Sequence, residues 1–316
     1  MSITVISPGP LTTVQDAGRT GYMQYGIGTC GAMDQEAYRA GNALVGNAGG
    51  EAVLEATLMG PTLRFDDECL LALTGADMGA LLDGAPAPRY RAVRAQAGQM
   101  LQLGFARAGC RGYIAVQGGI DVPKVMGSRS TDLKCRVGGV EGRALRRGDV
   151  LKAGAAVRPA EGRAMPAPDY ANDITVRVVP GPQYDCFTDA GHAAFLSTPY
   201  TLTQDSDRMG MRLDGAPIES VKGVDIVSDG AMFGSIQVPR SGKPIILMAD
   251  HQTTGGYAKI ATVCSQDLPL LAQLRPGGTV RFRAVSVEEA QRAYRRGIVG
   301  RLRGWLCSRW LSMRRR

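Results

Sequence analysis

The chain has 316 residues and a formal net charge of +8, and 42 of its residues are glycine. This length exceeds what one hydrophobic core usually supports, so we expect two domains. Glycine makes up about 13% of the chain against an average near ~7%, without a collagen-like period, which favours a turn-rich, mainly β fold with few helices.

The cysteine pattern and the N-terminus indicate a cytoplasmic protein. The N-terminal MSITVISPGP lacks the basic region and the long apolar stretch of a secretory signal. The apolar runs of the chain are strand-sized and interrupted by charge or glycine, so we expect no membrane-spanning helix. Seven cysteines stand far apart with no C-x-x-C pair, as is typical of a reducing compartment: Cys30, Cys69, Cys110, Cys135, Cys186, Cys264 and Cys307.

The local patterns predict mostly strands. A helix is expected from Asp34 to Val45, with Asp34 as its N-cap and Gly46 after its end, and a second helix around Tyr184 to Ser197. Runs of β-branched or alternating residues, bounded by glycine, proline or aspartate, predict these strands: Ser2 to Ile6, Leu70 to Thr74, Tyr113 to Gln117, Ile174 to Val178, Ile245 to Ala249, Ala258 to Val263 and Thr279 to Ala284.

An internal duplication divides the chain. ITV-x-x-PGP occurs at Ile3 and again, with one extra residue, at Ile174. Two later pairs are GGIDVPK with GSIQVPR and LRRG with LRPG, in the same order. We therefore expect related domains at 1–160 and 174–285, joined by a proline-rich linker. At a constant offset of 189 residues, Gln15, Asp16, Arg19, Gly21 and Gly26 match Gln204, Asp205, Arg208, Gly210 and Gly215.

The positive charge lies at the C-terminal end, residues 286–316. Nine arginines and no acid follow Gln291, and removing them from the 37 lysines and arginines leaves 28 basic against 29 acidic residues. Ser286 and Glu289 form a capping-box pattern before apolar residues spaced by three and four, which predicts a basic amphipathic helix. We expect a peripheral helix with a solvated arginine end. Contact with an acidic membrane surface or a partner subunit stays open, and we expect no nucleic-acid partner.

The stretch IILMADHQTTGGYAK has the pattern of a buried strand that delivers a polar site. Its apolar run stops at Asp250, and amide and hydroxyl groups follow at Gln252, Thr253 and Thr254. Glycines there let backbone N–H groups approach a ligand, and a lysine adds a positive charge. The alternative is a polar hairpin turn with no ligand. The remaining candidates for ligand contact are Gly255, Gly256, Tyr257 and Lys259.

Five sequence blocks resemble the carboxyltransferase-like family that includes the C subunit of 5-oxoprolinase. In chain order they are TTVQDAGRTGY with CGAMDQEAYRAGNALVGN, GGIDVPKVMGSRSTDLKCRVGGVEGR, VPGPQYDCF, DRMGMRLDG and SIQVPRSGKPIILMADHQTTGGYAKIATV. The same family includes the carboxyltransferase domain of urea carboxylase and the allophanate hydrolase subunit 2 and kinase-inhibitor antagonist proteins. The resemblance implies two tandem cyclophilin-like β-barrel domains, and we expect them to face each other across a cleft.

The resemblance also implies an activity and partners. It implies one component of a complex that uses ATP, with Mg²⁺, to open 5-oxoproline to L-glutamate. The expected partners are a second β-barrel protein, similar to the B subunit of 5-oxoprolinase, and a lactam-hydrolase-like A subunit, with ATP shared between the components. The chain has no biotinyl-lysine motif of the Met-Lys-Met type, so we expect no covalently bound biotin. Two alternatives remain open: a non-catalytic regulatory protein that antagonises a kinase inhibitor, and a biotin-dependent carboxyltransferase component that acts on a urea-like amide.

In this interpretation Asp250 and Lys259 are the catalytic residues. Asp250 would accept the N–H of the lactam or act as a base, and Lys259 with the Thr253 to Gly256 backbone would face the amide oxygen. We expect Arg208, with Arg19 and Asp16 of the first domain and Gln237 of the second, to line the cleft, an arginine gripping a carboxylate. Structural roles for the arginines, and an ion pair for Asp250, are the alternatives.

Other chemistries lack the residues they need. The two histidines, His192 and His251, give little material for a Ser-His-Asp arrangement. No cluster has metal-ligand spacing, so we expect no metal site on this chain. SGKP, beginning at Ser241, fails the pattern of a phosphate-binding loop, so ATP needs another binding mode or another chain.

Overall fold

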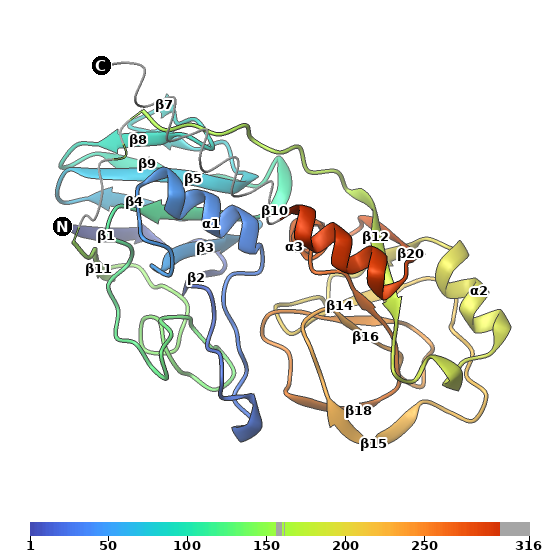
Figure 1. Cartoon of the computed structure of the whole chain (residues 1–316). Helices are drawn as coiled ribbons and strands as arrows, with labels where there is room; N and C mark the ends of the chain where they lie inside the picture. The colour runs from blue at the N-terminus through green and yellow to red at the C-terminus, as the bar shows by residue number, and fades with distance from the viewer. Residues whose placement is uncertain (156–159, 161, 298–316) are drawn as a thin grey trace. The chain divides into compact units, whose positions relative to one another are not determined.

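The computed structural model describes residues 1–155, 160 and 162–297, which form two compact units (Figure 1). Unit 1 consists of Met1–Gly21 and Cys30–Tyr170. Unit 2 consists of Tyr22–Thr29 and the chain from Ala171 onwards. The expectation of a mainly β fold with few helices is confirmed.

Unit 1 contains two antiparallel sheets packed around one core. The outer sheet has the strand order β11-β1-β4-β9-β6-β7 and the inner sheet β2-β3-β10-β5-β8. Apolar side chains of both sheets form one buried cluster, which includes Ile3, Phe65, Leu71 and Ile114. The strands are β1 (Ser2–Ser7), β2 (Thr12–Gln15), β3 (Val53–Thr57), β4 (Thr62–Phe65), β5 (Cys69–Asp77), β6 (Leu81–Leu82), β7 (Ala85–Pro86), β8 (Ala92–Ala95), β9 (Met100–Gln102), β10 (Ala108–Val116) and β11 (Val150–Lys152).

Helix α1 (Gln35–Leu44) covers the second face of the inner sheet (Figure 1). Along β5, Leu71 faces the core between the sheets while Ala72 packs under the helix, because successive side chains of a strand point to opposite faces. This explains why β5 is buried on both faces. The predicted N-cap is confirmed, since the Asp34 carboxylate accepts from the N–H groups of Glu36 and Ala37 at 3.1 and 2.9 Å.

Unit 2 is a closed barrel with a separate two-stranded ribbon. The barrel order is β12-β19-β16-β17-β14-β13-β20, and the parallel pairing of β12 with β20 contributes to its closure. Strands β15 (Asp225–Gly230) and β18 (Thr254–Tyr257) pair only with each other in the ribbon. The barrel strands are β12 (Asp173–Pro180), β13 (Tyr200–Leu202), β14 (Gly210–Asp214), β16 (Ser235–Gln237), β17 (Ile245–Leu247), β19 (Lys259–Val263) and β20 (Thr279–Ala284).

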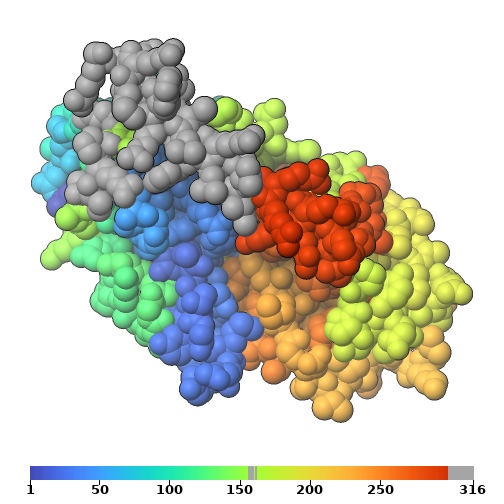
Figure 2. Space-filling view, viewed as in Figure 1, coloured from blue at the N-terminus to red at the C-terminus, as the bar shows by residue number. Residues whose placement is uncertain are grey.

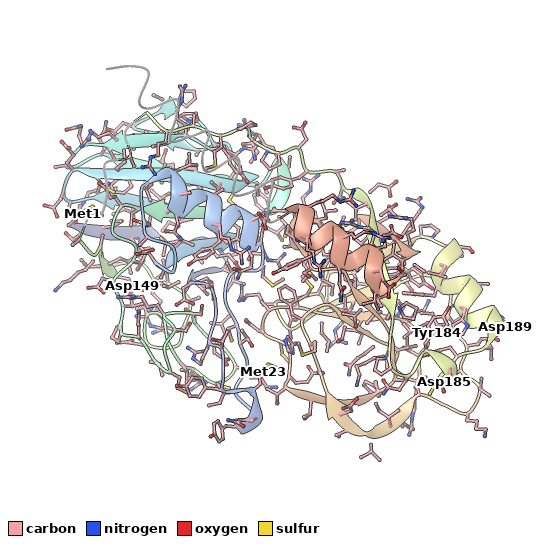
Figure 3. The ribbon with its side chains drawn as sticks, in the orientation of Figure 1. Met1, Met23, Asp149, Tyr184, Asp185 and Asp189 are labelled. Carbon is pink, nitrogen blue, oxygen red and sulfur yellow. The ribbon has the colours of Figure 1, made fainter. Side chains whose placement is uncertain are left out.

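The helix expected from Tyr184 to Ser197 is interrupted. Tyr184–Cys186 forms a 3-10 turn, η2, and the α-helix α2 is Asp189–Ser197, with Thr188 as its N-cap. The Thr188 hydroxyl accepts from the Gly191 N–H at 3.0 Å, which begins a new helix instead of continuing the turn. The Tyr184 ring, labelled in Figure 3, stacks on His192 at 3.8 Å and joins the two pieces. The other short helices are η1 (Met23–Tyr25) and α3 (Leu268–Gln273).

The sequence repeats correspond to neighbouring strands in both units. Strand β1 holds the start of the first repeat and pairs with β11, while β12 holds the start of its counterpart and pairs with β20. LRRG precedes β11 and LRPG precedes β20, so the first and last repeats are neighbours in each unit. The pairing is antiparallel in unit 1 and parallel in unit 2.

The C-terminal helix begins at residue 287 and is described as far as 297. Its predicted cap is present, because the Ser286 hydroxyl accepts from the Glu289 N–H at 3.1 Å. The predicted apolar face is not buried, however, since Val287 and Tyr294 are 49% and 47% exposed. The apolar positions Ile298, Leu302 and Trp305 lie outside the described residues.

None of the helices within 1–155 and 162–297 combines the length and the apolar character that a membrane crossing requires.

Candidate functional site in the second unit

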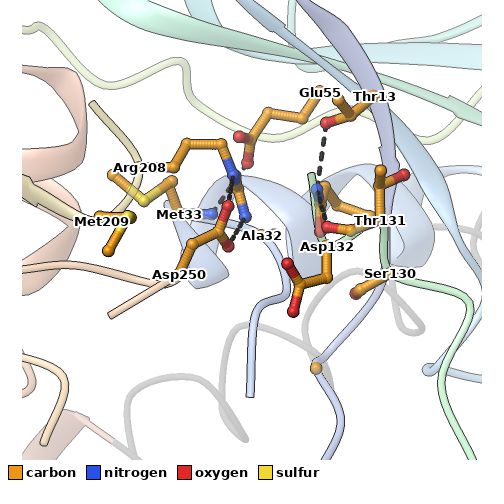
Figure 4. A network of polar contacts seen from close by, with 12 residues as sticks. Thr13, Ala32, Met33, Glu55, Ser130, Thr131, Asp132, Arg208, Met209 and Asp250 are labelled. Atoms are coloured by element: carbon orange, nitrogen blue, oxygen red, sulfur yellow. Dashed lines mark hydrogen bonds and ion pairs between the residues drawn. The ribbon is translucent and has the colours of Figure 1, made fainter. Parts of the chain in front are cut away.

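Asp250 is held by Arg208 in a buried ion pair. After β17, the backbone N–H of Met248 donates to Met209 O, and that of Asp250 donates to Arg208 O at 2.8 Å. This pairing brings the two side chains together. Arg208 Nε and Nη2 each lie 2.8 Å from a different Asp250 carboxylate oxygen (Figure 4). Both side chains are under 10% exposed, at 5% and 7%. The pair therefore has the bidentate geometry that fixes both groups.

Lys259 forms an ion pair with Asp229, and Asp250 is not its partner. Its Nζ lies 2.9 Å from Asp229 Oδ2. The lysine side chain is 4% exposed, whereas the aspartate is 55% exposed on the ribbon. The Lys259 backbone N–H donates to Gln183 Oε1 at 3.1 Å, which fixes the first residue of β19. Asp250 and Lys259 thus belong to two separate ion pairs.

Gln237 lies beside Lys259 on the neighbouring barrel strand. The two residues are paired in register between β16 and β19, and both are buried. Side chains of directly opposite residues on one face are close neighbours. Gln237 Oε1 accepts from Gln252 Nε2 at 3.3 Å. Gln237 Nε2 is buried and has no hydrogen-bond partner among the described residues. The residue paired with Lys259 therefore carries a buried donor without an acceptor among the described residues.

Gly255 lets the ribbon approach this amide. A Cβ added at Gly255 would lie 2.4 Å from Gln237 Nε2, so a larger residue would displace the glutamine side chain. In the ribbon Gly255 pairs with Asp229, whose carboxylate binds Lys259. The register therefore brings four residues to one place: Asp229 and Gly255 from the ribbon, and Gln237 and Lys259 from the barrel. We call this group the lysine site.

The TTGG segment is not a turn, which corrects the alternative of a polar hairpin turn at this place. Thr254–Tyr257 is strand β18, fixed by its pairing with β15, and Gly255 and Gly256 have no positive φ. Thr253 O accepts from the Ala231 N–H at 2.9 Å. Thr254 and Tyr257 are exposed on the ribbon. Among these residues, Gly255 belongs to the lysine site, and the preceding Gln252 contacts the site through its hydrogen bond to Gln237.

His251 is a buried side chain. Its Nδ1 lies 2.7 Å from the Gln252 carbonyl oxygen. Burial lowers the pKa of the ring below its ordinary value, with a smaller opposing effect of the Gln252 carbonyl. The neutral ring packs beside the strand end, in keeping with the small part that histidine plays in the proposed chemistry.

Asp16 holds a loop of unit 1. Its carboxylate accepts from the Ser128 and Ser130 hydroxyls at 2.7 and 2.6 Å, and from the N–H groups of Gly18 and Arg129 at 2.8 and 2.6 Å. These four bonds occupy both carboxylate oxygens. The contacts seen are those of a structural residue that anchors the 128–130 segment.

Arg19 is fully buried in the same loop. Its Nε and Nη2 donate to the carbonyl oxygens of Val125 and Ser130, each at 3.0 Å. In the same loop, Gln15 Nε2 donates to Thr13 Oγ1 and Thr131 O at 3.0 and 3.2 Å. Ligand binding by Asp16 and Arg19, and the cleft between the domains, stay predictions.

Asp229 and Gln183 were missed from the sequence. Asp229 precedes a glycine in VSDG, a pattern that indicates a turn and gives no sign of a site. Gln183 lies in the VPGPQYDCF block, but nothing in that block shows which side chain turns toward Lys259. Both meet the lysine through pairings far apart in the sequence.

Asp229 should titrate at unusually low pH. Its pKa lies below the ordinary value, chiefly because Lys259 donates to the carboxylate and secondarily because the Gly230 N–H does. A carboxyl of this kind favours the folded state above its unfolded pKa and loses that effect as the pH falls through the folded pKa. We expect an NMR titration to give Asp229 a pKa below that of an ordinary aspartate, and Lys259→Met to raise this pKa toward the ordinary value. An unchanged pKa in Lys259→Met would contradict the ion pair.

Comparisons with known proteins place the chain in a family. Residues 25–284 match the family described as "Carboxyltransferase domain, subdomain A and B". The chain is 42% identical to the C subunit of 5-oxoprolinase from Haemophilus influenzae over 93% of its own length and 94% of that protein. It is 43% identical to the C subunit of 5-oxoprolinase from Escherichia coli over 92% of its own length and 94% of that protein.

A solved structure agrees with this assignment. The crystal structure of Kluyveromyces lactis urea carboxylase matches 92% of this chain with a TM-score of 0.87 and 31% sequence identity. The chain spans 28% of that larger protein. The match over residues 25–284 and the identities above 40% lead to one conclusion: the chain belongs to the family of carboxyltransferase domains with subdomains A and B.

Proposed function

We propose that this chain is one subunit of an ATP-dependent 5-oxoprolinase complex that opens 5-oxoproline to L-glutamate. The observation that carries the proposal is the 42% identity to the C subunit of 5-oxoprolinase over nearly the full length of both chains. The proposed partners are a second β-barrel protein, similar to the B subunit of 5-oxoprolinase, and a lactam-hydrolase-like A subunit. ATP and Mg²⁺ would be shared with one of these partners.

The lysine site supplies the chemistry that this reaction needs from the chain. An unstrained lactam resists hydrolysis, and charge develops on its oxygen when it is activated. A buried ammonium and a buried amide donor without a partner suit an anionic oxygen, because hydrogen bonds inside a desolvated site are stronger than in water. Lys259 Nζ and Gln237 Nε2 would hold that oxygen. ATP, when bound, supplies the phosphoryl group that activates the lactam.

Asp250 has a supporting role in this proposal. Its carboxylate is held by Arg208 in a fixed orientation, with both oxygens accepting hydrogen bonds. A carboxylate has further lone pairs, so it can still accept the N–H of a bound lactam. Arg208 then acts by positioning Asp250 rather than by gripping a substrate carboxylate.

Reconstitution tests the function. We expect the three-subunit mixture to form glutamate and release phosphate from ATP only when this chain, both partners, ATP and 5-oxoproline are present. Each component is left out in turn, and complex assembly is checked by size-exclusion chromatography. Full turnover in the mixture that lacks this chain would refute the proposal.

A second candidate is carboxyl transfer to a urea-like amide. It is favoured by the TM-score of 0.87 to K. lactis urea carboxylase. The same chain is then assayed for carboxylation of urea with free carboxybiotin as donor. Formation of carboxylated urea, without formation of glutamate from 5-oxoproline, would support this second function instead of the first.

A further inference from the structure

We propose that Asp229 occupies the place of a ligand's anionic group, so that Lys259 exchanges its ion pair with Asp229 for one with a carboxylate or phosphoryl oxygen of the ligand. The inference rests on the proposed function for the kind of ligand, and on the lysine site alone for the exchange itself. Asp229 is then a competitor built into the chain, and its release accompanies binding.

The first argument is the unequal burial of the two partners. Lys259 is 4% exposed and starts a barrel strand, whereas Asp229 is 55% exposed. A buried ammonium needs an anion, because leaving it alone in a desolvated site is costly. An exposed carboxylate can instead be hydrated by water. Replacing Asp229 by another anion therefore costs little free energy, whereas leaving Lys259 without any anion costs much more.

The second argument is the donor that Asp229 leaves unused. Gln237 is the strand partner of Lys259, and its buried Nε2 has no hydrogen-bond partner among the described residues. A buried donor without an acceptor is rare in folded proteins and points to a missing group. A ligand carboxylate or phosphoryl group carries two or more oxygens, so it can accept from Lys259 and from Gln237 together. Asp229 meets only the first of these donors in the described contacts.

The third argument is the element that carries Asp229. Within the described residues, strand β15 pairs only with β18 and belongs to no barrel sheet. Nearly all of its residues are exposed, and its pairing register is interrupted between Asp225 and Asp229. The light orange edge of unit 2 in Figure 2 is this part of the chain. A two-stranded ribbon is only weakly stable by itself, so a small shift of β15 can withdraw the carboxylate.

Anion binding by the full-length chain tests the exchange. The probes are inorganic phosphate, 5-oxoproline and 2-pyrrolidinone, which is a lactam without a carboxylate, and binding is measured by isothermal titration calorimetry. We expect Asp229→Asn to bind phosphate or 5-oxoproline about tenfold more tightly than the parent chain, because the competing charge is gone. Phosphate and 5-oxoproline distinguish a phosphoryl from a carboxylate ligand. Binding of 2-pyrrolidinone should not change.

The matched control is Asp225→Asn, on the same strand. Asp225 forms an exposed pair with Arg240 and does not contact the lysine site. We expect this variant to bind as the parent does, and Lys259→Met to lose binding with or without Asp229. Circular dichroism confirms that each variant is folded.

Equal or weaker anion binding by Asp229→Asn would overturn the inference, and so would an equal gain in Asp225→Asn. These readouts need neither ATP nor partner subunits. A complex that fails to form glutamate would therefore refute the proposed function while leaving the exchange intact.

Discussion

Replacing Lys259 by methionine is expected to lower the rate of ATP-dependent 5-oxoproline hydrolysis by the reconstituted complex about 100-fold or more. Removing one preorganised donor from a site where negative charge develops typically costs about this much. The fold should survive the change. Methionine fills the buried space that the lysine stem occupies, and Asp229, at 55% exposure, is left in contact with water rather than buried and alone.

The control for this variant is Lys243→Met. Lys243 also forms an ion pair in unit 2, with Asp214, but its side chain is 40% exposed and belongs to no part of the lysine site. The Lys243→Met variant should keep turnover within about twofold of the parent, as expected for the loss of an exposed ion pair. A loss in kcat rather than in KM would show that Lys259 acts in the transition state. Normal turnover of Lys259→Met in an assembled complex would refute the role given to this lysine.

Local sequence signals predicted the elements well because they depend on neighbouring residues. The run from Thr279 to Ala284 forms β20 with the predicted bounds, and Asp34 caps α1 as its position before an amphipathic stretch indicates. The same kind of local signal gave a wrong indication of a turn at Thr254 to Tyr257. Threonine and glycine are common in turns, yet pairing with β15 makes this segment a strand.

The partners of the charged residues could not be predicted in the same way. Lys259 meets Asp229 30 positions away, and Arg208 meets Asp250 42 positions away. Which acid meets which base follows from strand register and from the ribbon, and these depend on long-range pairing. Asp250 and Lys259 were predicted to act together because they lie in one sequence motif. In the structure these two side chains belong to two separate ion pairs.

Replacing Asp250 by alanine is expected to lower the free energy of unfolding of the full chain by about 3 kcal/mol, because a buried ion pair loses one member while Arg208 stays in place. Both side chains are at most 7% exposed, and Arg208 makes two hydrogen bonds of 2.8 Å to the carboxylate. Urea denaturation followed by circular dichroism measures the change. Since the chain has two units, the transition of unit 2 is the one that should shift.

Two further variants separate the structural from the chemical role of Asp250. Asp225→Asn, which removes an exposed ion pair with Arg240, should leave the urea midpoint of unit 2 close to that of the parent. The double variant Arg208→Met with Asp250→Leu replaces the buried pair by apolar groups of similar size and should recover most of the lost stability. If turnover returns with stability, the pair of Asp250 and Arg208 has only a structural role. If the protein is stable but glutamate formation stays low, Asp250 contacts the lactam. A single Asp250→Ala variant as stable as the parent would contradict the buried pair itself.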